Sequence, residues 1–73
     1  MAHDGLKRHE AWQRSKVRAL RLTDAGDLHG AVATIRRDAS KIFGGLDPTT
    51  TFVGLEAAGE SAGAVREFIC GFH

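Results

Sequence analysis

The stretch Leu28-His-Gly-Ala-Val-Ala-Thr-Ile-Arg-Arg-Asp-Ala-Ser-Lys-Ile-Phe43 carries the clearest structural pattern in the chain. Its apolar residues recur at spacings of three and four, which places them on one stripe of a helix: Leu28, Ala31, Val32, Ile35, Ala39, Ile42 and Phe43. Charged and polar residues occupy the other side, and Gly44 with Gly45 ends the pattern. The stretch therefore predicts an amphipathic helix from about Leu28 to Phe43 that packs its stripe against a core.

A second helix is predicted before this one, from about Leu6 to Ala25. The turn between them contains Gly26, which suits the left-handed position after a helix end. Asp27 follows and suits the N-cap of the next helix. A turn this short joins two neighbouring helices, so the first half of the chain is predicted to be an antiparallel helical hairpin.

A third helix is predicted after the Gly pair, from about Phe52 to Cys70, following a loop from Gly44 to about Thr51. Asp47-Pro48 has the composition of a helix start, with Asp as the N-cap and Pro at the first helical position. Thr51 is a competing N-cap, and three consecutive threonines disfavour helix, so the start is left open. The stripe of this helix is predicted to contain Leu55, Ala58, Ala62, Val65, Ile69 and Phe72.

These segments predict an all-α fold in which the third helix packs across the hairpin. The 73 residues suffice for one domain, in which residues 1–5 are expected to be flexible. A chain of this length has a thin core, and its single cysteine excludes an internal disulfide, so association with a partner is a natural source of stability. The predicted core consists of Val17, Leu20, Leu28, Val32, Ile35, Ile42, Leu55, Val65 and Ile69.

The segment from Ala19 to Ile35 resembles the middle of a single tetratricopeptide repeat. Ala19 and Leu22 match the small and large positions of its first helix, Gly26-Asp27-Leu28 matches its turn, and Ala31 and Ile35 match its second helix. Ser15, Asp38 and Phe43 depart from the usual Trp, Ala and Pro of that pattern. The resemblance covers less than half of the chain and implies peptide or protein docking rather than chemistry.

No catalytic residue, metal site or cofactor is predicted. Gly59-Glu60-Ser61-Ala62-Gly63 matches the Gly-x-Ser-x-Gly string of hydrolases, but it lies inside a helical pattern and not on a strand-to-helix turn. The four histidines show no ligand spacing on one helix face. We therefore expect the chain not to be an enzyme. We also expect it to be cytoplasmic, because it shows neither an export signal nor an apolar stretch of about 20 residues.

Charge is distributed unevenly along the chain. Residues 1–41 carry nine basic and five acidic side chains, a net charge of +4, whereas residues 42–73 carry one basic and four acidic, a net charge of −3. A basic row about 21 Å long follows one side of the first helix and consists of Lys7, Arg14, Arg18 and Arg21. With Arg36 and Arg37, it gives a candidate set of phosphate contacts on nucleic acid. Alternatively, the row pairs with Glu56, Glu60 and Glu67 of the third helix, within one chain or between two.

Apolar residues outside the main stripes give a second functional hint. Trp12 lies away from Val17 and Leu20 around the first helix, and Phe68 and Phe72 extend the apolar surface of the last helix. Exposed aromatic side chains often anchor interfaces, so Trp12, Phe68 and Phe72, with Arg14 and Arg18 at the rim, are candidate partner-binding residues. The alternative is that the third helix covers Trp12 and makes it part of the core.

The sequence thus predicts a non-enzymatic protein-interaction module, regulator or inhibitor that binds a larger protein through exposed helix faces. We expect a homodimer, no membrane association and no small-molecule substrate. A small protein that associates with nucleic acid through the basic row is the alternative.

Overall fold

The computed structural model describes the backbone of residues 2–72 and the side chains of residues 7–72, and this part of the chain is all-helical. Its helices are α1 (Ala2–Asp24), α2 (Leu28–Phe43), α3 (Pro48–Glu60) and α4 (Ala62–Cys70). The prediction of three helices is therefore wrong for the described chain, which has four. Of the segment 1–5, expected to be flexible, residue 1 lies outside the described residues and the others already belong to α1.

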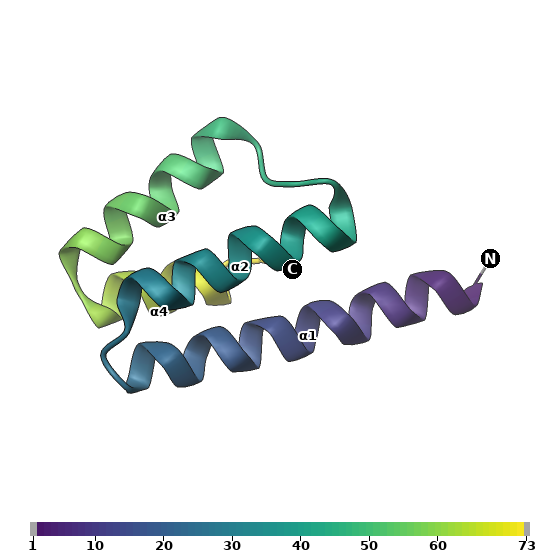
Figure 1. Cartoon of the computed structure of the whole chain (residues 1–73), viewed down its shortest axis with the longest axis horizontal. Helices are drawn as coiled ribbons and strands as arrows, with labels where there is room; N and C mark the ends of the chain where they lie inside the picture. Colours follow the sequence, from purple (N-terminus) through teal and green to yellow (C-terminus); the bar gives the residue numbers. More distant parts are fainter. Residues whose placement is uncertain (1, 73) are drawn as a thin grey trace.

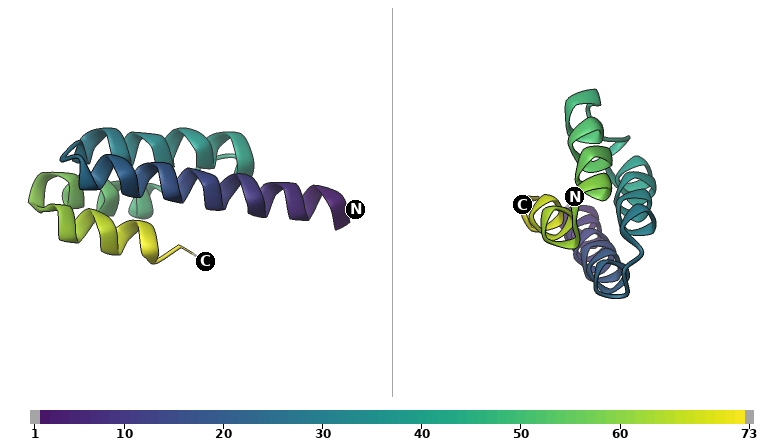
Figure 2. Two further views of the ribbon diagram at one scale, coloured as in Figure 1. Left: turned by 90° about the horizontal axis from the view of Figure 1, so that it is seen from below. Right: turned by 90° about the vertical axis from the view of Figure 1, so that its left-hand side faces the viewer.

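The helices form two consecutive hairpins that pack on each other (Figure 1). α1 and α2 run antiparallel, and the N-terminal part of α1 extends beyond α2. The end view in Figure 2 shows the four helices around a common centre, with α1 and α3 on one diagonal. Accordingly, α1 and α3 make no contact with each other in the described chain, while α4 packs against α1, α2 and α3.

The turn between α1 and α2 follows the sequence prediction. Gly26 has φ of 87°, a left-handed conformation that favours glycine. The Asp27 carboxylate accepts a hydrogen bond of 3.0 Å from the Gly30 amide and so caps α2. At the other end, Gly44 is again left-handed, with φ of 84°, and its amide donates to the Ala39 carbonyl.

α3 begins at Pro48 with Asp47 as its N-cap, so the helix start indicated by Asp47-Pro48 is confirmed and the start near Phe52 is wrong. The loop before the helix is reduced to residues 44–47. The Asp47 carboxylate caps the helix by accepting from the Thr50 hydroxyl and from the Thr50 amide, the latter at 3.1 Å. These hydrogen bonds, that from the hydroxyl first, lower the pKa of Asp47 below its usual value. The N-cap and the proline together outweigh the low helix propensity of the three threonines.

The expected third helix is divided at Ser61, which is the main correction to the predicted fold. Ser61 is extended, with φ of −167° and ψ of 163°, and its hydroxyl accepts a hydrogen bond of 3.1 Å from the Ala64 amide. Ser61 therefore ends α3 and caps α4. Gly59 and Gly63 on either side lower the helix propensity of this segment, which makes the interruption inexpensive.

The core confirms part of the predicted set. Val32, Ile35, Val65 and Ile69 are fully buried, and three others are partly buried against them: Leu20, Leu28 and Ile42. Val17 and Leu55, by contrast, are 48% and 45% exposed, so their assignment to the core is wrong.

Two physical causes explain these errors. On α1 the inward stripe consists of Trp12, Ser15, Ala19 and Thr23, whose small members allow α2 to approach closely. The Thr23 hydroxyl is satisfied inside this stripe, because it donates to the Ala19 carbonyl at 2.8 Å. On α3 the inward side consists of Gly54, Ala57 and Ala58, so Leu55, one residue after Gly54, faces outward.

Candidate functional site

Trp12 lies in the core, and this corrects its assignment as an exposed anchor. It is 2% exposed, and its ring packs edge-to-face against Phe43 at a centroid distance of 5.2 Å and against Phe72 at 5.3 Å. Phe72 in turn packs against Phe68 at 5.1 Å. The alternative prediction, in which Trp12 is covered and belongs to the core, is therefore confirmed. Lys16 reinforces this closure by donating to the Phe72 carbonyl at 3.2 Å.

Among the described residues, three of the five large apolar side chains that are exposed gather instead on the outer face of α3; the other two are Val17 of α1 and Phe43 of α2, which the sequence placed on the buried stripe. Phe52 is 63% exposed, Val53 48% and Leu55 45%, within four consecutive residues. Sequence reasoning missed this surface because it assumed one long helix with one stripe. A signal was present, since Phe52, Val53 and Leu55 cannot all lie on the side of a helix that also buries Ala57 and Ala58.

A shallow groove of about 390 Å³ runs beside this face, between α3 and α4. We call it the acidic groove, because three glutamates line it around an apolar floor: Glu56, Glu60 and Glu67 with Val53, Ala57, Ala64 and Phe68. No ion pair engages these glutamates within the described part of the chain. Phe68, predicted as a partner-binding residue, thus does line a surface groove, and Phe72 lines the hollow next to it.

A second surface lies on the outer side of α1. We call it the α1 patch, and it consists of Gln13, Arg14, Val17, Arg18 and Arg21, which line a shallow depression. Its centre is the half-exposed Val17, and its charged members are exposed. Three of the four residues of the predicted basic row are therefore brought together; Lys7 is exposed two turns closer to the N-terminus.

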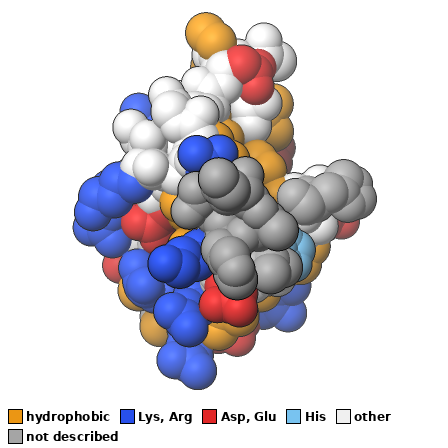
Figure 3. All heavy atoms as spheres, turned by 90° about the vertical axis from the view of Figure 1, so that its right-hand side faces the viewer, with side chains coloured by type: hydrophobic (Ala, Val, Ile, Leu, Met, Phe, Trp, Pro, Cys, Tyr) orange, Lys and Arg blue, Asp and Glu red, His pale blue; other side chains and the backbone are white. Residues whose placement is uncertain are grey.

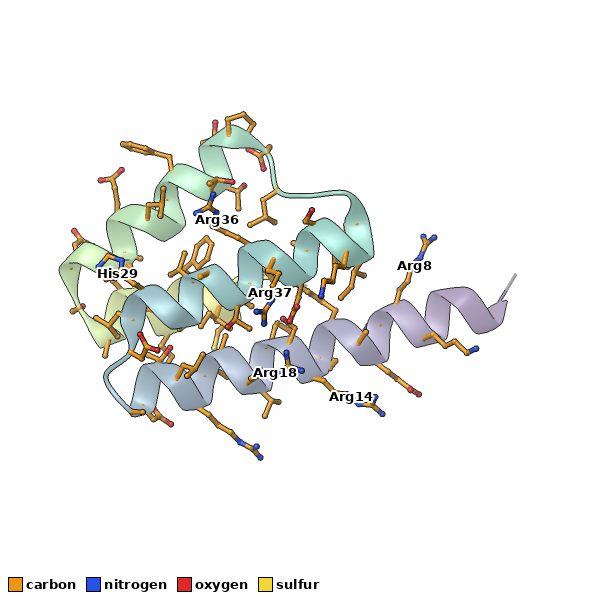
Figure 4. The ribbon with its side chains drawn as sticks, in the orientation of Figure 1. Arg8, Arg14, Arg18, His29, Arg36 and Arg37 are labelled. Carbon is orange, nitrogen blue, oxygen red and sulfur yellow. The ribbon has the colours of Figure 1, made fainter. Side chains whose placement is uncertain are left out.

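The remaining basic candidates lie on α2 and are partly compensated. The Asp38 carboxylate is 3.4 Å from the Arg18 guanidinium and 3.7 Å from that of Arg37, so it bridges α1 and α2. Arg36 extends from α2 toward α3 (Figure 4). Together with Arg37, it lines a separate hollow that includes Leu46 and Thr51. The six basic candidates therefore form an interrupted surface over the α1–α2 hairpin and not one continuous row.

The basic row and the glutamates do not meet within one chain. Arg14 and Arg18 extend from α1 (Figure 4), whereas the acidic groove lies between α4 and α3, the helix diagonal to α1 (Figure 2). In Figure 3, Lys and Arg side chains gather on the lower left. The ion pair that joins the two hairpins involves other residues, Arg66 with Asp24.

Among the described residues, no three His, Cys, Asp or Glu side chains gather as a metal site requires. Ser61 of the Gly-x-Ser-x-Gly string uses its hydroxyl to cap α4 and lies between two helices, with no strand in the described residues to form a nucleophile turn. Within residues 2–72, no helix combines the length and the apolar character that a membrane crossing needs.

Comparison with known protein families, curated proteins and solved structures found no match to this chain. The resemblance of Ala19–Ile35 to a tetratricopeptide hairpin therefore stays a prediction.

Proposed function

We propose that this chain is a small protein-interaction module that binds another protein through the outer face of α3 and the adjoining acidic groove. One observation carries the proposal: Phe52, Val53 and Leu55 are each about half exposed or more on one short helix. A helix that is apolar on its outer as well as its inner side is normally covered on both.

The exposed apolar area of α3 provides a driving force for association. Burial of apolar surface contributes roughly 25 cal/mol per Å², so covering three half-exposed apolar side chains favours association. A ring the size of Phe52 is a common interface anchor, because aromatic residues are enriched in interface cores. The three glutamates beside it add a rim that selects partners with basic side chains.

The test is capture of partners on the immobilised protein, compared with the double variant Phe52→Ser/Leu55→Ser. Both positions are exposed, so the variant should fold, which circular dichroism would verify. We expect the double variant to lose the captured protein, while His29→Ser, which changes an exposed side chain of α2 outside both the α3 face and the α1 patch, retains it. Equal capture by the wild type and the α3 variant would refute the proposed surface.

Nucleic-acid association through the α1–α2 hairpin is the second candidate. It is favoured by the exposure of Lys7, Arg14, Arg18 and Arg21 on one helix, and opposed by the carboxylate of Asp38 beside Arg18. Binding of a labelled duplex that falls steeply with salt, and that Arg14→Glu weakens, would support it. Capture that survives nuclease and high salt would instead favour the protein partner.

A further inference from the structure

We propose that the acidic groove accepts the α1 patch of a second copy of this chain, so that the protein associates head to tail. This inference rests on the proposed function, since it names the occupant of the same docking surface. The partner is identified by its chemistry: an apolar residue at the centre of a helix face, flanked by guanidinium groups.

The two surfaces are complementary in charge. The groove has Glu56, Glu60 and Glu67 at its rim, and no ion pair satisfies them in the described chain. The α1 patch has Arg14 and Arg21, which likewise lack an ion-pair partner among the described residues. Oppositely charged surfaces that face each other steer association and fix its register.

The apolar parts of the two surfaces also match. The groove has the small side chains of Ala57 and Ala64 alongside the larger Val53 and Phe68. On the α1 patch, Val17 lies among the arginines and is half exposed. Val17 would occupy the floor, while the long apolar stems of the arginines cover the walls and their charged ends reach the glutamates.

The arrangement of the helices decides the type of assembly. α1 and α3 are diagonal in the bundle and do not touch, so the patch and the groove face different directions (Figure 2). One copy then offers its patch to a neighbour and its groove to another. Such a heterologous contact generates a ring or an open chain rather than a closed symmetric pair.

The contact is expected to be weak. The α1 patch has five residues, compared with about 20–30 residues on each side of an interface of standard size. Its charges are exposed and therefore screened by salt beyond a Debye length of about 8 Å at physiological ionic strength. Self-association should appear at high protein concentration and low salt.

The experiment is sedimentation of the full chain over a range of concentrations. We expect the wild type to grow in mass with concentration at low salt. Two charge-reversal variants, Arg14→Glu/Arg21→Glu in the patch and Glu56→Arg/Glu60→Arg in the groove, should each weaken association about tenfold or more. An equimolar mixture of the two variants should associate again, because each then offers the charge that the other has lost.

Two single variants control for the effect of net charge, each with half the charge change of the corresponding double variant. Glu10→Arg makes α1 more basic outside the α1 patch and should leave self-association intact or stronger, although it changes the charge as Glu60→Arg does. Arg36→Glu on α2 changes the charge as Arg14→Glu does and should have little effect. Restored association in the mixture also demonstrates that both double variants are folded.

A wild type that remains monomeric at all concentrations, or variants that associate like the wild type, would overturn head-to-tail docking. The proposed function fails separately, when Phe52→Ser/Leu55→Ser captures the same proteins as the wild type. Capture that depends on Phe52 and Leu55, together with a strictly monomeric chain, would therefore reject the second copy as occupant and keep the docking surface.

Discussion

Replacement of Gly54 by Ala should destabilise this protein, although the same change in a helix is normally favourable. Gly54 lies inside α3 and is buried against the ring of Phe68. A Cβ at this position would be 2.6 Å from Cζ and 2.9 Å from Cε2 of that ring. The ring cannot move freely, because it packs against Phe72 at 5.1 Å.

The expected magnitude follows from two opposing terms. Ala gains about 0.5–1 kcal/mol over Gly in a helix interior, and overpacking typically costs about 1–3 kcal/mol. With the middle of both ranges, Gly54→Ala should therefore lower the free energy of unfolding by roughly 1 kcal/mol, and at most by about 2.5 kcal/mol. Gly59→Ala is the matched control in the same helix, since a Cβ there meets nothing within 4 Å. It should raise the free energy of unfolding by up to about 1 kcal/mol.

The assay is thermal and urea unfolding followed by circular dichroism. With an unfolding entropy of about 2.1 cal/mol/K per residue, 1 kcal/mol shifts Tm of a 73-residue chain by about 6 °C. The two variants should therefore differ by roughly 6–20 °C in Tm. In a Phe68→Leu background, Gly54→Ala should become stabilising because the ring is absent. Equal stabilisation by Gly54→Ala and Gly59→Ala in the wild-type background would refute the close contact.

Three further predictions concern the core and the helix caps. Trp12→Ala should lower the free energy of unfolding by about 3–5 kcal/mol and leave the chain largely unfolded by circular dichroism, since it removes the ring on which two others pack; a folded variant would contradict its place in the core. Ser61→Ala should cost about 1 kcal/mol in urea unfolding, whereas Ser61→Asp keeps an acceptor for the Ala64 amide and should cost less; equal losses would argue against the cap. The hydrogen bonds from Thr50 lower the pKa of Asp47, so its stabilising effect is full above the usual aspartate pKa of about 3.9 and is lost as the pH falls through the lowered value. The stability difference between wild type and Asp47→Ala, from urea unfolding at graded pH, should therefore shrink only in strong acid; a difference independent of pH would contradict this.

The local signals in the sequence predicted local structure well. Gly26 with Asp27 defined the first turn, and the stripe of α2 is buried at Ala31, Val32, Ile35 and Ala39, as its spacing indicated. Caps and periodic stripes are determined by residues close in sequence, so they can be read without the rest of the chain.

The arrangement of α1 was not predictable in the same way. A helical-wheel projection of α1 has apolar residues on two sides, one with Val17 and one with Trp12 and Ala19. Which of these sides faces inward depends on the helices that pack against α1. The buried Ser15 and Thr23 made the true inward side look polar. The error about Leu55 arose because the predicted stripe joined it to Ala58, whereas the inward side of α3 consists of Gly54, Ala57 and Ala58.

The candidate surface was missed because the sequence assigned Leu55 to the inward side of α3 and looked for binding residues elsewhere. The sequence assigned partner binding to the aromatic residues Trp12, Phe68 and Phe72. In the structure Trp12 is buried in the core, and Phe68 is partly buried and lines the acidic groove. The charges were predicted more successfully, since the spacing of Arg14, Arg18 and Arg21 placed them on one side of α1. Side-chain charge is fixed by identity and helix phase, whereas exposure depends on distant contacts.

The position of Trp12 also gives the protein an internal optical probe. The chain has one tryptophan and no tyrosine, so its near-ultraviolet emission comes from this indole. The indole contacts Phe43 at the end of the first hairpin and Phe72 just after the second, so its emission depends on whether the two hairpins are joined. Circular dichroism depends on the helices themselves. If both signals change at the same denaturant concentration, the hairpins unfold as one cooperative unit; an earlier change in emission would show that they separate while still helical.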